Sequence, residues 1–296
     1  MTTRGSPTMS DGHAVVRCFH TTAMVADYER TRDALVRLVG LRVLEDSRLE
    51  DPAIGRRGGM AWVGDNIIEI GEPIVVGGAV DRFVQRFGSH MSSIAVQVAD
   101  IDATVEHLLY HGVRIASRVD GHIVFTHPGD TGGVVVEWFG AEEPLDPRYG
   151  GPMPPPIADP VLDVCQMAFG GAVVDDVAAA ADRLALLFGR EVTFRHQGAP
   201  AGAPAAGVSM GDCTLALYPR PGPAESTALW GHVYERPQTS NFGVRVPDLA
   251  DASDRLSAAT VQILRADQDA IVIPPGATGG VTVVVVDRLL PGDPRA

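Results

Sequence analysis

One short pattern, apolar residues followed by Asp, recurs four times along the chain at nearly constant intervals. Its Asp residues stand at positions 27, 100, 176 and 248, which are 73, 76 and 72 residues apart. A second motif follows each of them, in the segments Val39–Val43, His111–Ile115, Phe188–Val192 and, in a weaker form, Thr260–Ile263. This period is longer than that of solenoid repeats, so four copies predict duplicated supersecondary modules.

Each module reads as one strand, one helix and three further strands. In the first module the β-type run Ala14–Thr22 leads to Asp27, which caps a helix, and a Gly ends the helix. Three more strands are expected at Arg42–Asp46, Met60–Val63 and Asn66–Ile70. The runs Gly133–Phe139 and Gly280–Asp287 close the second and fourth modules. The sequence therefore predicts an α+β chain of four βαβββ modules.

A segment rich in Pro and Gly divides these modules into two pairs. It follows residue 142, contains the run Pro154-Pro155-Pro156 and is expected to form an extended linker. We therefore predict a disordered tail over residues 1–12, an N-terminal domain over 13–142, a linker over 143–160 and a C-terminal domain over 161–292.

The charge and cysteine content exclude several classes of function. The formal net charge is −13 and every basic side chain other than His is Arg, so we expect no nucleic-acid partner and no lysine Schiff-base chemistry. Cys18, Cys165 and Cys213 are odd in number and far apart, which argues against a disulfide framework and a cysteine zinc site. No apolar run is long enough to span a membrane. We expect a cytoplasmic protein, monomeric or homodimeric, whose partner is a small-molecule substrate.

Three segments of the first half place imidazole or carboxylate groups in β-type surroundings: His20–Asp27, Ile67–Pro73 around Glu69, and Gly133–Glu137. In this order and spacing they resemble the vicinal oxygen chelate superfamily, which includes glyoxalase I, methylmalonyl-CoA epimerase, extradiol dioxygenases and antibiotic-resistance binding proteins. The resemblance covers most of residues 13–290. It implies two tandem glyoxalase-like domains, each formed by two modules curled around a cavity.

The resemblance also implies a metal site in which His20, Glu69 and Glu137 are ligands. The family's remaining ligand, a His, is replaced by Ser93, and the nearby His90 lies three residues upstream. Since strand side chains alternate between faces, His90 joins the site only if the strand bulges or begins later. Such a set of N and O ligands would suit Fe, Mn, Co, Ni or Zn, acting as a Lewis acid on an enolate.

The residues themselves point to buried carboxylates. Glu69 and Glu137 are flanked by Ile, Val and Trp, and burial of two carboxylates is costly without a metal, protonation or an Arg partner. His20 is either a ligand or a hydrogen-bonded core histidine. Tyr28, Trp62 and Trp138 either line the cavity and bind substrate together with Ser93, or simply pack in the core.

The second half lacks these groups. When it is aligned on the first half, the positions of His20, Glu69, Ser93 and Glu137 are taken by Phe169 or Ala168, Ala216, Asn241 and Val284. None of these sets forms a metal site, so the C-terminal domain is expected to be degenerate.

The leading functional hypothesis is a small-molecule isomerase, epimerase, lyase or dehydratase with enolate-type chemistry, with or without a divalent metal. His20, Glu69 and Glu137 would be its catalytic residues. One alternative is a metal-independent tailoring enzyme of secondary metabolism, such as aromatic or polyketide metabolism, using Glu/His acid–base catalysis. Another is a metal-free protein that binds an antibiotic or metabolite and confers resistance. A ring-cleaving extradiol dioxygenase is disfavoured, because Ser93 replaces a required His and because those enzymes usually have their active half second.

Overall fold

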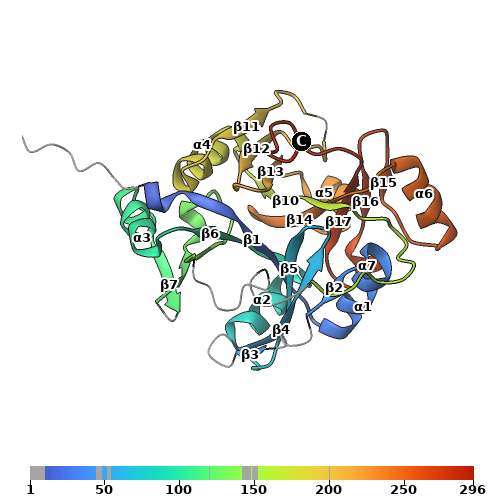
Figure 1. Ribbon diagram of the computed structural model, residues 1–296, viewed down its shortest axis with the longest axis horizontal. Coiled ribbons are helices and arrows are strands. Elements are labelled where there is room, and N and C mark those ends of the chain that lie inside the picture. Colours follow the sequence, from blue (N-terminus) through green and yellow to red (C-terminus); the bar gives the residue numbers. More distant parts are fainter. Residues whose placement is uncertain are drawn as a thin grey trace, which may run out of the picture.

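Two β-sheets with the same strand order form the framework of the molecule (Figure 1). The computed structural model describes residues 11–44, 49–51, 55–119, 121–141, 148, 153–199 and 201–296. Sheet A has the order β2-β4-β5-β1-β6-β9-β8-β7, with β3 paired to β4, and sheet B has the order β11-β12-β13-β10-β14-β17-β16-β15. In each sheet the first strands of two modules lie next to each other at the centre. The chain is therefore an α+β protein with two tandem domains, each of paired βαβββ modules, as the repeats predict.

Sheet A and its helices come from the first half of the chain. Their bounds are β1 (Val15–Met24), α1 (Tyr28–Val39), β2 (Arg42–Val43), β3 (Leu49–Asp51), β4 (Arg56–Val63), β5 (Asn66–Pro73), α2 (Ala79–Phe87), β6 (His90–Val98), α3 (Ile101–Tyr110), β7 (Ile115–Val119), β8 (Ile123–Thr126) and β9 (Val136–Phe139), with short 3₁₀ turns η1 (Asp11–His13) and η3 (Pro128–Asp130).

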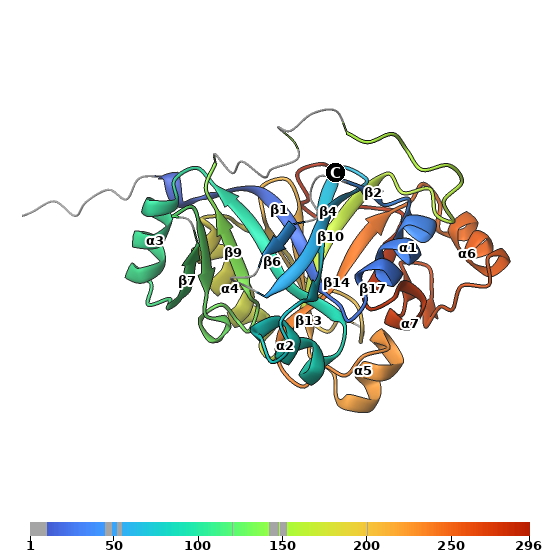
Figure 2. The ribbon, with the colours of Figure 1, turned by 90° about the horizontal axis from the view of Figure 1, so that it is seen from below.

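Sheet B and its helices come from the second half. Their bounds are β10 (Gln166–Val174), α4 (Val177–Phe188), β11 (Val192–Arg195), β12 (Ala206–Ser209), β13 (Thr214–Pro219), α5 (Pro223–Trp230), β14 (Gln238–Arg245), α6 (Leu249–Ala258), β15 (Arg265–Ala266), β16 (Ile271–Ile273), α7 (Pro275–Thr278) and β17 (Thr282–Val286). Helices α3 and α6 lie at opposite ends of the long axis of the molecule (Figures 1 and 2).

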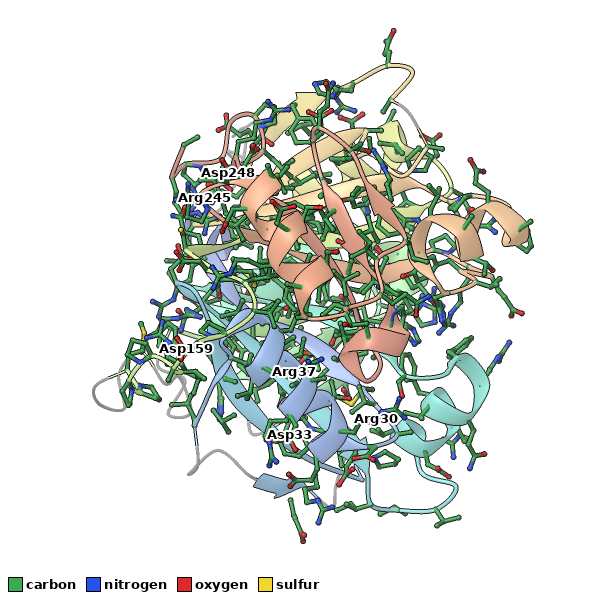
Figure 3. The ribbon with its side chains drawn as sticks, turned by 90° about the vertical axis from the view of Figure 1, so that its right-hand side faces the viewer. Arg30, Asp33, Arg37, Asp159, Arg245 and Asp248 are labelled. Atoms are coloured by element: carbon green, nitrogen blue, oxygen red, sulfur yellow. The ribbon has the colours of Figure 1, made fainter. Side chains whose placement is uncertain are left out.

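The four repeated Asp residues begin the four main helices. Asp27, Asp100, Asp176 and Asp248 each have an extended backbone, and each side chain accepts hydrogen bonds from backbone N–H groups of the first turn. Helix α1 then shows the expected amphipathic pattern. Arg30, Asp33 and Arg37 lie exposed along its outer side (Figure 3), while Leu35 and Leu38 are buried. The recurring Asp is thus a helix-capping signal.

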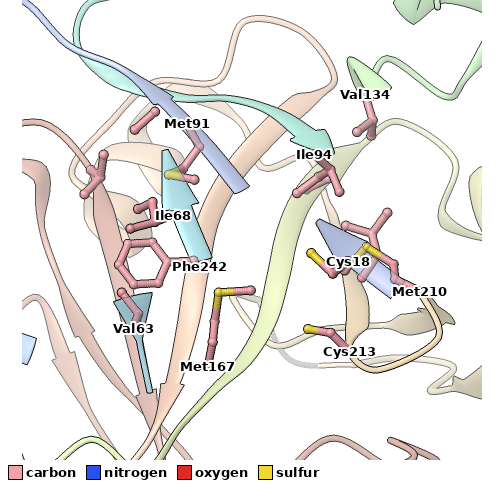
Figure 4. Close-up of a cluster of buried hydrophobic side chains, with 14 of the residues drawn as sticks. Cys18, Val63, Ile68, Met91, Ile94, Val134, Met167, Met210, Cys213 and Phe242 are labelled. Carbon is pink, nitrogen blue, oxygen red and sulfur yellow. The ribbon is translucent and has the colours of Figure 1, made fainter. Parts of the chain in front are cut away.

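The sheets share one hydrophobic core between them. It combines Ile68, Ile94 and Met91 of sheet A with Phe242 and Met167 of sheet B, all fully buried (Figure 4). Side chains that alternate with these residues point to the outer face of each sheet and form two smaller clusters, one per half. The two sheets therefore pack with their inner faces together, and each outer face provides a separate surface for a site.

Some expectations lie partly outside the described residues. The tail predicted over 1–12 and most of the linker predicted over 143–160 belong to this group, although residues 153–160 are described and form no helix or strand. The predicted strand Arg42–Asp46 is described as far as residue 44, of which Arg42 and Val43 are in β2. Within the described ranges, no helix combines the length and apolar character needed to cross a membrane.

A candidate acid–base site on sheet A

Four strands bring the predicted polar residues together on the outer face of sheet A. Thr22 of β1 is in register with Glu69 on the parallel strand β5 and with Ser93 on the antiparallel strand β6. Glu137 of β9 is in register with Ala95, two residues beyond Ser93 on β6. The pairing of these strands therefore brings together side chains that are 44 to 115 residues apart in sequence.

A β-bulge places His20 on this face. The register of β1 against β6 shifts between Cys18 and His20, so that Phe19 and His20 are both buried beside Phe139. The ring of Phe139 lies 4.5 Å from the Phe19 ring and 5.5 Å from the His20 ring, centroid to centroid. The same shift recurs in β10 just before Phe169, so the bulge is part of the duplicated module.

The Glu137 carboxyl group is held by two hydroxyl groups. The Ser93 hydroxyl donates a hydrogen bond to Glu137 Oε1, and the Thr22 hydroxyl donates to the same oxygen at 3.4 Å. Burial, followed by the negative charge of Glu69, raises the Glu137 pKa to about 7, although the two hydroxyl bonds and Arg56 oppose this shift. Near neutral pH this group can therefore both give and accept a proton.

Glu69 has the opposite protonation behaviour. Its Oε1 lies 2.7 Å from Arg56 Nη1, and its Oε2 lies 3.9 Å from His20 Nε2. Burial alone would raise the Glu69 pKa, but the charges of Arg56 and His20 outweigh burial and lower it. Glu69 is therefore ionised and paired while Glu137 titrates near neutrality.

Arg56 is the main residue of the site that sequence reasoning did not name. It lies at the start of β4, and its side chain extends along the strand past Gly71 to reach Glu69. Arg56 Cδ passes 3.7 Å from the point where a Gly71 Cβ would lie, so a larger residue there would crowd it. The burial cost of the carboxylates predicted a cation, an acid or a metal in general terms, but not which residue supplies the charge.

His20 is neutral and hydrogen-bonded. It is only 1% exposed, and its Nδ1 lies 3.0 Å from the Thr22 hydroxyl oxygen. Burial lowers the His20 pKa to about 4; Glu69 opposes this shift, while Arg56 and Arg148 reinforce it. Thr22, also absent from the predicted set, thus contacts both His20 and Glu137. Because strand side chains alternate between faces, Thr22, two residues after His20 on β1, could have been predicted to share its face.

The three aromatic candidates are divided between the two faces of sheet A. Trp62 packs with Phe19 and Phe139 beside the carboxyl groups. Trp138 lies in the core between the sheets, 5.6 Å from the Phe188 ring, and Tyr28 begins α1 in that same core. Of the three, only Trp62 is placed where it can contact a ligand of this site.

His90 is not brought to the carboxyl groups. Its ring packs between those of Phe83 and His232, and its Nδ1 lies 3.1 Å from the Gly88 carbonyl oxygen. The register of β1 against β6 shifts between Ser93 and Met91, so strand alternation from Ser93 does not fix the direction of His90. Its ring contacts are with Phe83, Phe87 and His232, and not with Glu69 or Glu137, so His90 is not a ligand at those carboxyl groups.

The donor set around Glu69 and Glu137 does not fit a divalent metal. Within the described residues, no three His, Cys, Asp or Glu side chains are positioned to hold a metal ion. Ser93 donates to Glu137 where the family resemblance implied an imidazole, and Arg56 already supplies the positive charge next to Glu69. The groups form a charge-balanced acid–base cluster instead.

The equivalent face of sheet B is apolar. The strand register matches Gly171 of β10 to Ala216 and Asn241, as it matches Thr22 to Glu69 and Ser93 in sheet A. Phe169, Ala216 and Val284 are buried with Tyr218, Trp230 and Tyr234 in one cluster. The alignment of the two halves by sequence agrees with these positions, with Phe169 rather than Ala168 opposite His20.

Comparisons with known proteins agree with this architecture. Residues 19–127 match the model of the Glyoxalase/Bleomycin resistance protein/Dioxygenase superfamily. The structure of a mutant of 4-hydroxymandelate synthase from Streptomyces coelicolor is similar, with a TM-score of 0.65 and 14% sequence identity. The superposition covers 94% of this chain and 95% of the synthase. Methylmalonyl-CoA epimerase from Mycobacterium tuberculosis, 22% identical, covers 48% of this chain over 96% of its own, with a TM-score of 0.41. No sequence among curated proteins matches. Residues 19–127 thus match the glyoxalase/bleomycin resistance/dioxygenase superfamily, also called the vicinal oxygen chelate superfamily, and the tandem two-sheet fold of that match extends through both halves of the chain.

Proposed function

We propose that this protein is a small-molecule enzyme that moves a proton to and from a carbon atom next to a carbonyl group, without a metal. Isomerisation, epimerisation and elimination of water or another small group all begin with this step. The observation that supports the proposal is the buried pair Glu69 and Glu137. Arg56 holds the Glu69 carboxyl group ionised, while burial and the Glu69 charge raise the pKa of Glu137 to about 7.

In this proposal Glu137 carries out the proton transfer. A general base is most effective when its pKa is close to the working pH, and Glu137 titrates near 7. Two carboxyl groups whose pKa values are pushed apart by their surroundings are a recurring arrangement for acid–base catalysis. Ser93 and Thr22 fix the carboxyl group in orientation, so that its other oxygen, Oε2, is the atom that accepts the proton.

Arg56 provides the complementary charge. Removal of a proton beside a carbonyl group places negative charge on the carbonyl oxygen, and the Arg56 guanidinium can donate a hydrogen bond to that oxygen. The neutral His20 donates its one N–H, on Nδ1, to the Thr22 hydroxyl and so positions the hydroxyl that donates to Glu137. Glu69 keeps Arg56 in place at 2.7 Å and remains ionised while it does so. Trp62 and Phe139 contribute apolar surface next to these groups.

Oxygen-dependent ring cleavage is less well supported. Non-haem iron oxygenases bind their metal through two His and one carboxylate, and this cluster contains one His, His20. The likeness to 4-hydroxymandelate synthase is one of fold, since the two sequences are 14% identical. The substrate is therefore proposed only as a small carbonyl compound with an acidic C–H bond.

A binding protein without catalysis is the second candidate. The Nε1 of Trp62 is buried without a hydrogen-bond partner in the described residues, next to the Phe19 and Phe139 rings. An aromatic ligand with an acceptor atom would satisfy it. This candidate shares the site but requires no proton transfer by Glu137.

Deuterium exchange distinguishes the two candidates. A panel of carbonyl compounds with acidic C–H bonds, from thioesters to 2-hydroxyketones, is incubated in D₂O with chelator-treated protein and followed by NMR. We expect exchange in at least one compound, and a fall of about 100-fold or more in Glu137→Gln. Glu191→Gln, at an exposed position of sheet B's half, is the control. Full exchange by Glu137→Gln, or exchange only after metal is added, would contradict the proposal.

The pH dependence gives a sharper test of Glu137. Because the ionised form is the base, the exchange rate should rise with pH through about 7. The Ser93 hydroxyl lowers the Glu137 pKa by bonding the carboxylate, so Ser93→Ala should move the midpoint of the profile to higher pH. A midpoint that stays in place in Ser93→Ala would assign the titration to another group.

A further inference from the structure

A cavity of about 760 Å³ lies between the two halves, beside the start of β6. Its wall includes His90 and Ser92 of β6, Arg183 of α4, and Arg236 and Gln238 at the start of β14. The Ser92 hydroxyl lies 3.4 Å from that of Ser93, so the acid–base site is a neighbour. Neither Glu69 nor Glu137 lines this inter-domain cavity, which is therefore a different space from the acid–base site.

Two buried acceptor atoms in the cavity wall have no hydrogen-bond partner in the described residues. His90 is 2% exposed, and its Nδ1 faces the Gly88 carbonyl oxygen at 3.1 Å, which places the proton on Nδ1. The His90 Nε2 is then an acceptor, because burial lowers the pKa of this ring to about 4 and keeps it neutral. The Oε1 of Gln238, a residue that is 7% exposed, is the second such acceptor. Unsatisfied buried acceptors are rare and costly.

The carboxylates in the wall already have partners. Asp130 forms an ion pair with Arg114 at 2.8 Å, and Asp175 forms one with Arg220 at 2.6 Å. Asp176 caps α4 by accepting a hydrogen bond from Ala179 N at 2.9 Å. Two of these three carboxylates are thus paired with an arginine, which reduces the negative charge that the wall presents to the cavity.

The arginines in the wall lack acidic partners. Arg183 donates to the backbone carbonyl oxygens of Asp130 and His111, and carbonyl oxygens do not neutralise its charge. Arg236 stacks 4.1 Å above the Phe87 ring, and among the described residues it forms no ion pair with a carboxylate. The positive charge in this wall is thus available to an anion from outside.

We propose that the inter-domain cavity binds a small organic carboxylate that also carries a hydroxyl group. The carboxylate accepts hydrogen bonds from the Arg236 and Arg183 side of the wall, where an anion is favoured. The hydroxyl group donates to His90 Nε2 or Gln238 Oε1, which removes an unsatisfied acceptor. Val135, Val174 and Ala180 of the wall contact the apolar part of the ligand. The cavity volume is within the range of small-molecule sites.

Ligand-observed NMR on the full chain tests this proposal. The probes are hydroxylated monocarboxylates, both aliphatic and aromatic, each compared with its neutral amide and with the same acid lacking the hydroxyl group. We expect carboxylates to bind more tightly than amides, and Arg236→Gln to weaken them by about tenfold or more, the effect of one charge-assisted hydrogen bond. Glu137→Gln should bind the same probes as the wild type, since Glu137 does not line the cavity.

A second variant keeps the test informative if the cavity tolerates Arg236→Gln poorly. Gln238→Met removes one acceptor at similar volume, so it should reduce the preference for hydroxylated over non-hydroxylated acids while leaving the preference for carboxylates over amides. Thermal unfolding shows whether each variant is folded. The proposal is overturned if no carboxylate binds at millimolar concentration, if Arg236→Gln binds as well as the wild type, or if only Glu137→Gln loses binding.

Discussion

Glu69 and Glu137 show how neighbours decide the chemistry of identical side chains. Both are about 95% buried on the same face of sheet A, and burial alone would raise the pKa of each. Of these two carboxyl groups, Glu69 forms the ion pair with Arg56, and so the two separate into an ionised partner and a titrating acid. A single guanidinium therefore assigns both roles.

The raised pKa of Glu137 predicts a pH-dependent stability. An unfolded Glu titrates near 4.5 and the folded one near 7, so the favourable contribution of the protonated group is complete below about 4.5 and is lost as pH rises through about 7. The shift corresponds to about 3 kcal/mol at most. Glu137→Gln cannot titrate, so its stability relative to the wild type should increase between pH 5 and pH 8.

Urea unfolding of both proteins across this range measures the difference. His20 and Glu69 remain in both, so their own titrations largely cancel. A constant difference between wild type and Glu137→Gln across the range would show that Glu137 has an ordinary pKa.

The arrangement around Ser93 also predicts how metal binding could be introduced. Ser93→His supplies the missing imidazole, and Arg56→Gln removes the cation that competes for Glu69. The double variant should bind Zn²⁺ or Ni²⁺ at micromolar concentration, and the wild type should not, as measured by isothermal titration. Stoichiometric zinc binding by the wild type would show that Arg56 does not exclude a metal.

The sequence predicted most of this cluster by two routes. The apolar neighbours of Glu69 and Glu137 in their strands indicated burial one segment at a time, while His20 and Ser93 were predicted through the family resemblance. Arg56 could not be found in this way, since its contact depends on the pairing of β4 with β5 and on a long side chain that spans several residues. Long flexible cations are placed by tertiary structure.

At the scale of the elements, the ends of the four repeated helices show which backbone conformation the repeat retains. A residue with a left-handed backbone ends each of the first three helices, directly after the helix at Gly40 and Gly189 and one residue later at Gly112, with φ of 66°, 58° and 72°. The fourth copy has Thr260 there, with φ of 56°. The weakened motif of the fourth module therefore keeps the backbone turn although a β-branched residue is strained in it.

Thr260→Gly should therefore stabilise the protein. Glycine adopts positive φ without the steric penalty, and the gain should be about 1 kcal/mol in the free energy of unfolding. Gly189→Ala, at the matching end of α4, is the converse control and should destabilise by a similar amount. Thermal unfolding of both variants measures this pair, and a loss of stability in Thr260→Gly would refute the strain.

Three short helices were not predicted from sequence. Helix α5 begins at Pro223, and Pro is compatible with the first turn of a helix. Helices α2 and α7 also begin after Gly or Pro without a side-chain cap. These helices lack the Asp signal of the four repeated ones, and their formation depends on packing against the sheets.

At the scale of the whole molecule, the shared core ties the halves together. Phe188 of α4, in the second half of the chain, is fully buried and contacts Trp138 of β9, in the first half. Gly133 of the first half approaches Pro237 of the second so closely that a Cβ would overlap it. We therefore expect one cooperative unfolding transition.

Phe188→Ala tests this expectation. Loss of the ring from a packed core should cost about 3 kcal/mol or more, and calorimetry should show a single peak moved to lower temperature. Leu186→Ala, on the exposed side of the same helix, should have little effect. Two peaks, of which only one moves, would mean that the halves unfold independently.

The pairing of four modules in one chain has a consequence for dilution. When a glyoxalase-like domain is built from modules on separate chains, its folded fraction depends on protein concentration through mass action. Here β1 and β6 pair within sheet A and β10 and β14 within sheet B, so every module finds its partner on the same polypeptide. The local concentration of each partner is fixed by covalent connection, and the acid–base site persists however scarce the protein becomes.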